Sequence, residues 1–115
     1  MEAELGRFFE AHGYETKMLL RTVLDLAEGQ GAEVVTSVEG RELVFRRGEG
    51  GRGFLRVLPQ AVGLVLGFPR GGELFDPKSF LKGPSGFQKS VRILDAADLD
   101  PYLRRMLGEA YGLDG

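Results

Sequence analysis

The sequence contains no cysteine, no tryptophan and no asparagine, and His12 is its single histidine. Without cysteine the chain can form no disulfide, no zinc site built on thiolates and no cysteine nucleophile. One histidine cannot supply a two-histidine metal site. None of the four serines lies in a G-x-S-x-G elbow. We therefore predict that the protein is not an enzyme, with no catalytic residue, no metal site and no cofactor.

Long hydrophobic runs and an excess of one charge are also missing. No stretch approaches the roughly 18 apolar residues that a membrane span needs, and the N-terminal residues do not resemble a signal peptide. The net charge is -2, whereas nucleic-acid-binding domains are usually basic. We expect a cytoplasmic protein without membrane contact, and nucleic acid is disfavoured as a partner. The scarcity of asparagine and glutamine favours a thermophilic source.

Hydrophobic periodicity predicts the helices. The 115 residues are typical of one globular domain, and we assign residues 1–115 to it. Apolar side chains recur with helical spacing up to His12 and again from Glu15 to Glu28, so that two N-terminal helices meet at His12-Gly13. A third helix is predicted to begin at Asp100-Pro101, where an N-cap precedes a proline.

Between the helices the apolar residues alternate with polar ones, which is typical of strands. We predict five strands, over residues 32–38, 41–46, 52–58, 62–68 and 88–94. The first three connections are short enough for antiparallel hairpins. Residues 69–87 form one long excursion, in which Asp76-Pro77 predicts a helical turn through residues 79–81. The expected fold is α+β, with a five-stranded, mainly antiparallel sheet and the helices on one of its faces.

Glycine is abundant, with 18 residues, and Gly48, Gly50 and Gly53 spell the G-x-G-x-x-G pattern of nucleotide-binding loops. A dinucleotide fold needs a helix after this motif, whereas residues 54–59 continue as a predicted strand. We therefore interpret residues 48–53 as a hairpin loop in which glycine allows positive φ angles.

Strand alternation places basic residues on the face of the sheet opposite the helices, which we call the outer face. Arginine forks there could hold a phosphate or a carboxylate, an aromatic ring could stack, and glycines would allow close approach by a ligand or another backbone. The alternative is a solvated face, or one covered in a homodimer. The predicted ligand-binding residues are Arg46, Phe54, Arg56, Gly63, Gly67 and Arg92.

Several short motifs follow one another from Val62 onward. They are a Gly-x-x-Leu-x-Asp-Pro stretch ending at Pro77, Leu81 with Gly83, a strand over residues 91–94, and Asp98-Leu99-Asp100 before the last helix. In these features the segment resembles the C-terminal half of the YdhG-like family of small domains of unknown function. The resemblance covers about half of the chain and implies an α+β domain with helices packed on an antiparallel sheet. One branch of that family is associated with frataxin-like iron delivery through acidic surface residues.

The leading functional hypothesis is a small binding or interaction domain. We expect the outer face and the excursion to contact a protein partner or a small anionic ligand, because a connection of 19 residues is unusual in a compact domain. The alternative is a frataxin-like iron-binding protein that uses surface carboxylates such as Glu2, Glu4 and Glu10. A third hypothesis is an enzyme that clamps an anionic substrate between Arg56 and Arg92.

Overall fold

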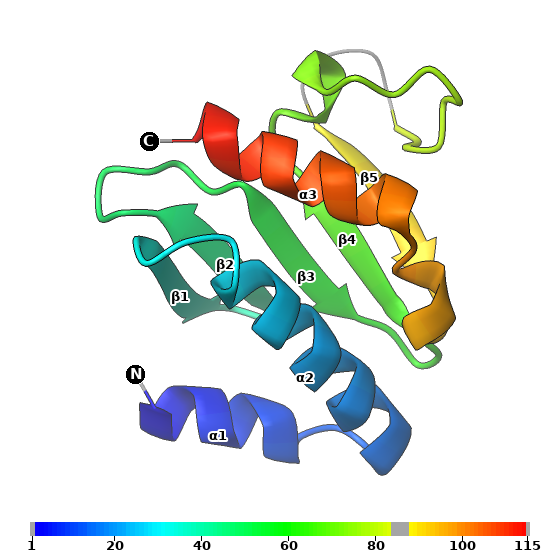
Figure 1. Cartoon of the computed structure of the whole chain (residues 1–115). Helices are drawn as coiled ribbons and strands as arrows, with labels where there is room; N and C mark the ends of the chain where they lie inside the picture. Colours follow the sequence, from blue (N-terminus) through cyan, green and yellow to red (C-terminus); the bar gives the residue numbers. More distant parts are fainter. Residues whose placement is uncertain (1, 84–87, 115) are drawn as a thin grey trace.

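The structure, a computed structural model, describes residues 2–83 and 88–114. Two helices come first and a third ends the described chain, with five strands and two 3-10 turns between them (Figure 1). Their bounds are α1 (Glu2–Glu10), α2 (Tyr14–Glu28), β1 (Val34–Glu39), β2 (Glu42–Arg47), β3 (Leu55–Pro59), β4 (Leu64–Phe68), η1 (Gly71–Glu73), β5 (Lys89–Ile93), η2 (Ala96–Asp98) and α3 (Pro101–Leu113). The predicted α+β class and the order of the main elements are confirmed.

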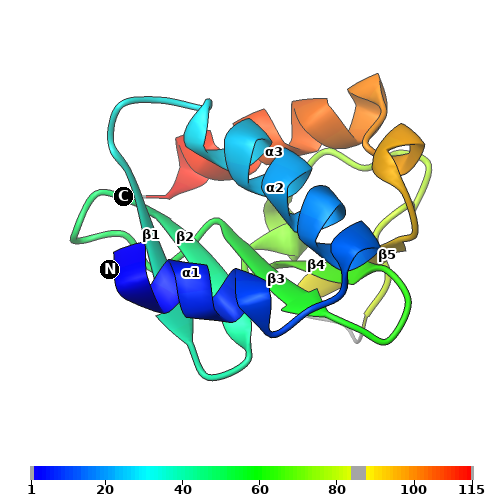
Figure 2. The ribbon, with the colours of Figure 1, turned by 90° about the horizontal axis from the view of Figure 1, so that it is seen from below.

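The five strands form one sheet in the order β1-β2-β3-β4-β5, and every neighbouring pair is antiparallel. The helices α2 and α3 lie across the same face of this sheet, as Figures 1 and 2 both show. The helix α1 packs against α2 and β1. No described helix covers the outer face, so the predicted placement of the helices on one face is also confirmed.

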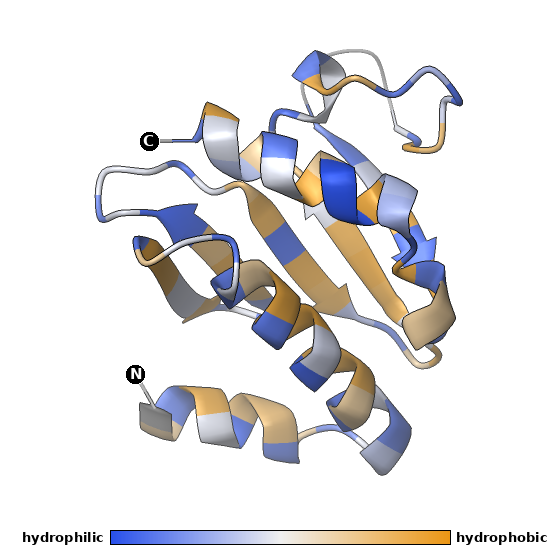
Figure 3. Ribbon diagram, viewed as in Figure 1, coloured by the Kyte–Doolittle hydropathy of each residue, from blue (hydrophilic) through white to orange (hydrophobic). Residues whose placement is uncertain are grey.

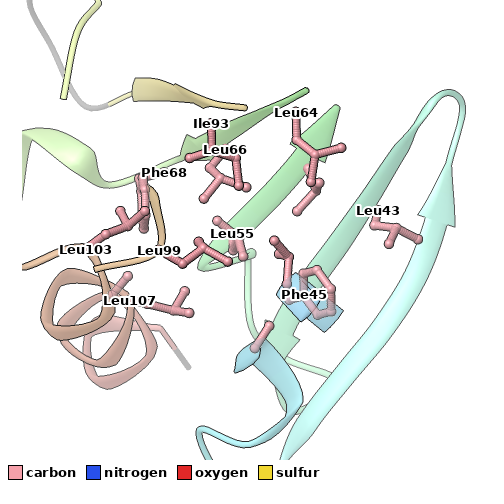
Figure 4. Close-up of a cluster of buried hydrophobic side chains, with 14 of the residues drawn as sticks. Leu43, Phe45, Leu55, Leu64, Leu66, Phe68, Ile93, Leu99, Leu103 and Leu107 are labelled. Atoms are coloured by element: carbon pink, nitrogen blue, oxygen red, sulfur yellow. The ribbon is translucent and has the colours of Figure 1, made fainter. Parts of the chain in front are cut away.

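The core lies between the inner face of the sheet and the apolar stripes of α2 and α3. Figure 3 shows hydrophobic segments of β3 and β4 beneath these helices, and Figure 4 shows side chains of the sheet and of α3 pointing toward one another. Leu43, Phe45, Leu55, Leu64 and Ile93 are at most 1% exposed. Burying one such side chain contributes roughly 1.5–3 kcal/mol, so the packing determines which face each strand turns toward the helices.

The predicted start of the last helix is confirmed. The Asp100 carboxylate accepts a hydrogen bond from the Leu103 amide at 2.9 Å, and Pro101 occupies the first turn of α3. Asp95 caps the short turn η2 in the same manner. Each carboxylate satisfies an amide that has no partner within its own helix.

The predicted helical turn after Asp76-Pro77 is wrong. Residues 79–81 form no helix, and the helical turn in this part of the chain, η1, lies earlier, at Gly71–Glu73. Ser79 has a φ of 50°, in the left-handed region, which a right-handed helix cannot contain. Asp76 acts instead as a turn residue, because its carboxylate accepts hydrogen bonds from the Phe80 and Leu81 amides.

The backbone requires glycine at Gly63 but not at Gly67. Gly63 has a φ of 80°, and a Cβ there would lie 2.2 Å from the Ile93 carbonyl oxygen. A Cβ on Gly67 would lie 3.7 Å from the Arg56 carbonyl oxygen, an ordinary van der Waals contact. The close backbone approach expected at these glycines therefore occurs at Gly63, where the neighbour is β5 of the same chain.

We predict that Gly63→Ala lowers the free energy of unfolding by at least about 2 kcal/mol, because it combines a left-handed φ with a backbone clash. Gly67→Ala, the matched control, should change it by less than about 1 kcal/mol. Urea denaturation followed by circular dichroism measures both. Equal stabilities of the two variants would contradict this account of Gly63.

Candidate functional site

The outer face at β1, β2 and β3 carries charges of both signs, and they pair with one another. Arg46 forms an ion pair with Glu39 and donates a hydrogen bond to the Ser37 hydroxyl at 2.8 Å. Arg56 donates to Glu42 at 2.7 Å and lies 3.5 Å from a Glu39 oxygen. The hydrogen bond from Arg46, with that from Ser37 and the charge of Arg56, lowers the pKa of Glu39 although burial opposes the shift. We call these four charged residues the Arg-Glu network.

The Arg-Glu network covers an apolar residue of the outer face. Val44 is fully buried although it does not belong to the core between sheet and helices. Its neighbours across the sheet are Ser37 and Arg56, and its neighbours on the same face of β2 are Glu42 and Arg46. The aliphatic stems of arginines readily cover such a side chain. Two of the three predicted arginines are thus engaged with glutamates of their own face.

Phe54 does not lie where its predicted stacking role requires. Its side chain is 2% exposed and belongs to the core, where its ring packs edge-on against Tyr111. The Phe54 amide donates to the carbonyl of Phe45, which is also the partner of Leu55, so two residues oppose one as in a β-bulge. Gly53, with a φ of 118°, precedes this bulge. Strict alternation placed Phe54 on the outer face, and the bulge makes that placement wrong.

Arg92 lies at the other end of the outer face, on β5. It is exposed, and one of its guanidinium nitrogens donates to the Val62 carbonyl at 2.8 Å. A groove of about 560 Å³ opens beside it, between β4, β5 and the excursion. We call it the excursion groove, and its lining consists of Val65, Lys78, Ser79, Phe80, Lys82, Ser90, Val91 and Arg92. Among the described residues, its lining therefore contains three basic side chains, two hydroxyls and no carboxylate.

Backbone hydrogen bonds hold one wall of the excursion groove to the sheet. The Lys82 amide donates to the Ser90 carbonyl and the Ser90 amide donates to the Lys82 carbonyl, both at 2.7 Å. This single bridge extends the sheet beyond β5. Residues 84–87, which complete the predicted excursion, lie outside the described residues.

Asp76 and Tyr102 attach the same wall to α3. The Asp76 carboxylate accepts hydrogen bonds from the Phe80 amide, the Leu81 amide and the Tyr102 hydroxyl. The Phe80 ring packs edge-on against the Tyr102 ring. These contacts hold the backbone on both sides of the exposed Ser79 and sustain its left-handed conformation, which costs roughly 1–3 kcal/mol in a residue other than glycine.

The carboxylate of Asp76 is stabilised in its charged form. Burial by itself would raise the pKa of Asp76, but hydrogen bonds from Tyr102, Leu81 and Phe80 and the charge of Lys89 outweigh burial and lower it. Burial and the hydrogen bond to Asp76 raise the pKa of the Tyr102 hydroxyl. The pair is therefore a charged acceptor and a neutral donor near neutral pH.

The sequence contains a signal for the excursion groove that strand alternation does not reveal. Residues 77–94 carry four basic side chains and no acidic one, and they include three of the four lysines of the chain. Lys78 and Lys82 were not among the predicted binding residues. Only the tertiary structure brings them beside Arg92, the predicted residue that retains an exposed guanidinium.

The other motifs of the sequence either have a structural role or do not bring side chains together into a binding site. Residues 48–53 lie in the loop between β2 and β3, as predicted, but β3 begins at Leu55 and not at residue 52 as predicted; Gly48 has a φ of 73°. His12 follows α1, with its ring edge-on to Phe8. Within residues 2–83 and 88–114, no group of three or more histidine, aspartate or glutamate side chains could hold a metal ion. No helix in this part of the chain is long and apolar enough to cross a membrane.

No protein-family model, no curated protein and no solved structure matches this chain. The resemblance to the YdhG-like family therefore stays a prediction.

If the Arg-Glu network neutralises the arginines of the outer face, removing its carboxylates should create an anion site. We predict that the double variant E39Q/E42Q binds inorganic phosphate at least about tenfold more tightly than the wild type near β2 and β3. Two-dimensional NMR locates the binding through the amide resonances of Val44 and Arg56. The variant E10Q/E15Q, which changes the net charge equally, should leave those resonances unaffected. Identical titrations of all three proteins would show that the glutamates do not block the arginines.

The lowered pKa of Asp76 predicts a pH dependence of stability. Because its pKa in the folded protein is below the unfolded value of about 3.9, Asp76 stabilises the fold above that value and loses its effect as the pH falls through the folded-state pKa. Asp76→Asn should lower the free energy of unfolding by about 1–3 kcal/mol at pH 7. It should also flatten the decline of stability between about pH 5 and pH 2. Urea denaturation across this range tests it, with Asp25→Asn as control, and a decline as steep as in the wild type would refute the role of Asp76.

Proposed function

We propose that the protein is a binding domain that takes the phosphate or carboxylate group of a ligand in the excursion groove. The lining of the groove carries the proposal: among the described residues that line it are three cations and two hydroxyls, and no carboxylate. The chain as a whole has a net charge of -2, so this local excess of positive charge is not a general property of its surface. Arginine and lysine side chains beside hydroxyl donors are the groups that hold oxyanions in proteins.

The three cations of the groove differ in how far they already interact with other groups of the chain. Lys78 places its ammonium 4.9 Å from the centre of the Tyr102 ring, so this cation is held over the ring. Lys82 is exposed, and no acidic side chain within the described residues pairs with it. Arg92 uses part of its guanidinium for the Val62 carbonyl and keeps further N–H donors. Lys82 and Arg92 are therefore the principal anion-binding residues in this proposal.

The apolar part of the lining defines the ligand further. Val65, Phe80 and Val91 contribute hydrophobic surface to the same groove. A ligand that combines an oxyanion with an apolar or aromatic body uses both parts, and inorganic phosphate uses only one. The proposal is of binding without catalysis, since neither a carboxylate nor a histidine lines the groove to act as general base.

Titration with phenyl phosphate and with benzoate tests this function and separates the two oxyanions. Isothermal titration calorimetry should show saturable binding of at least one of them to the wild type. The double variant K82E/R92E should weaken that binding at least about tenfold, because it replaces two attractive charges by two repulsive ones. The double variant R21E/R41E changes the net charge by the same amount on α2 and in the β1-β2 turn, and it should bind like the wild type.

Two kinds of outcome would refute the proposal, one in the binding measurements and one in the oligomeric state. One is the absence of saturable binding, or an equal loss of binding in both double variants. The other is that the wild type sediments as a dimer which K82E/R92E dissociates while neither ligand binds, because the groove would then be a contact between two copies of the chain.

A further inference from the structure

The loop between β2 and β3, residues 48–53, surrounds a carboxylate of the chain itself. Asp114, which follows α3, accepts hydrogen bonds from the backbone amides of Arg47 at 2.9 Å, Arg52 at 3.0 Å and Gly53 at 3.2 Å. A second hydrogen bond from the Gly53 amide, at 3.3 Å, reaches the other oxygen of the carboxylate. The Asp114 residue is only 6% exposed. Both of its carboxylate oxygens are thus held by backbone N–H groups.

Three glycines of this loop, Gly48, Gly51 and Gly53, are needed for that arrangement. A Cβ on Gly51 would lie 2.6 Å from an Asp114 carboxylate oxygen and 2.7 Å from the Arg47 carbonyl oxygen. Gly48 and Gly53 have φ angles of 73° and 118°, which other residues rarely adopt. Backbone amides that converge in this way on one point form a concave anion site. Gly48 and Gly53 of the G-x-G-x-x-G pattern, together with Gly51, thus shape an oxyanion site without the helix that a dinucleotide fold requires.

We propose that the β2-β3 loop is an oxyanion receptor whose resident occupant is Asp114, and that a phosphate or carboxylate ligand competes with Asp114 for the same three amides. This inference concerns a site separate from the excursion groove. It does not depend on whether the groove binds a ligand.

The surroundings of Asp114 allow a ligand to reach the amides. Asp114 lines two hollows, of about 640 and 510 Å³, which lie on the surface beside the loop. Arg52 and Arg70 line the larger hollow and Arg47 lines the smaller one. Arg52 is exposed, and within the described residues no acidic side chain pairs with it. Once the Asp114 carboxylate withdraws, the amides and Arg52 attract an anion from solution, whereas Arg70 and Arg47 remain paired with Glu73 and Glu33, which line the same hollows.

Withdrawal of the carboxylate does not disturb the core. The Asp114 side chain is not part of the hydrophobic cluster, and its amide is held by the Ala110 and Tyr111 carbonyls at 3.2 Å. Arg70 adds a hydrogen bond to the carbonyl of Leu113 and pairs with Glu73. Because Asp114 is tethered, it competes at an effective concentration on the order of millimolar. External anions should therefore bind the wild type weakly and the receptor without Asp114 much more tightly.

The variants D114A and D114N test the competition. Inorganic phosphate and acetate are titrated separately, in the K82E/R92E background so that the excursion groove does not contribute, and the amide resonances of Arg47, Arg52 and Gly53 are followed by NMR. D114A should bind at least one anion at least about tenfold more tightly than the parent protein, and the comparison shows which oxyanion the loop prefers. D114N, which keeps a carbonyl oxygen but loses the charge, should lie between the two.

Thermal unfolding gives an independent measurement. D114A should have a lower midpoint than its parent, and the anion that binds should raise the midpoint of D114A more than that of the parent. If D114A does not fold, the same comparison is made with D114N. Equal anion affinities with and without the Asp114 carboxylate, or no response of the three amides in any variant, would overturn the inference.

Discussion

The burial of one face of the sheet beneath α2 and α3 is the constraint on which the other features depend. Because strand side chains alternate between faces, the packing of Leu43, Phe45, Leu55 and Ile93 into the core sends Arg46, Arg56 and Arg92 to the outer face. Charges placed there need partners or solvent. Glutamates at the β1-β2 end of the face supply partners, and the β5 end leaves its cations exposed. Burial of the inner face thus leads to two different regions on the outer face, one with paired charges and one with exposed cations.

The carboxylates of Asp76 and Asp114 hold two irregular segments outside the sheet in defined conformations. Asp76 collects two backbone amides and the Tyr102 hydroxyl, and it attaches the excursion to α3. Asp114 collects three backbone amides and attaches the β2-β3 loop to the end of α3. A charged acceptor with several N–H donors forms stronger hydrogen bonds than a neutral pair. Both candidate binding regions therefore lie beside irregular segments that α3 holds in place.

The separation of charge along the chain explains how a slightly acidic protein presents a basic groove. Residues 77–94 contain no carboxylate, and this segment supplies most of the groove lining. The other predicted arginines, Arg46 and Arg56, lie beside glutamates of β1 and β2. Glu39 and Glu42 face each other across the β1-β2 turn and lie within reach of Arg46 and Arg56. The difference between the two halves of the outer face is thus a difference in neighbours rather than in the number of arginines.

The sequence by itself determined the helices, the five strands, the antiparallel pairing of the first four and the helix start at Asp100, because these depend on local periodicity and on residues close together in the chain. Strand alternation alone places Glu42 and Arg46 on the same face of their strand, but the ion pair of Arg46 with Glu39 depends on the register of the β1-β2 hairpin. Only the tertiary structure decided that a bulge turns Phe54 inward, that Lys82 joins Arg92, and that Asp114 enters the glycine loop. Arg52 and Asp114 are 62 positions apart. Such contacts arise from packing between distant segments, which no local pattern encodes.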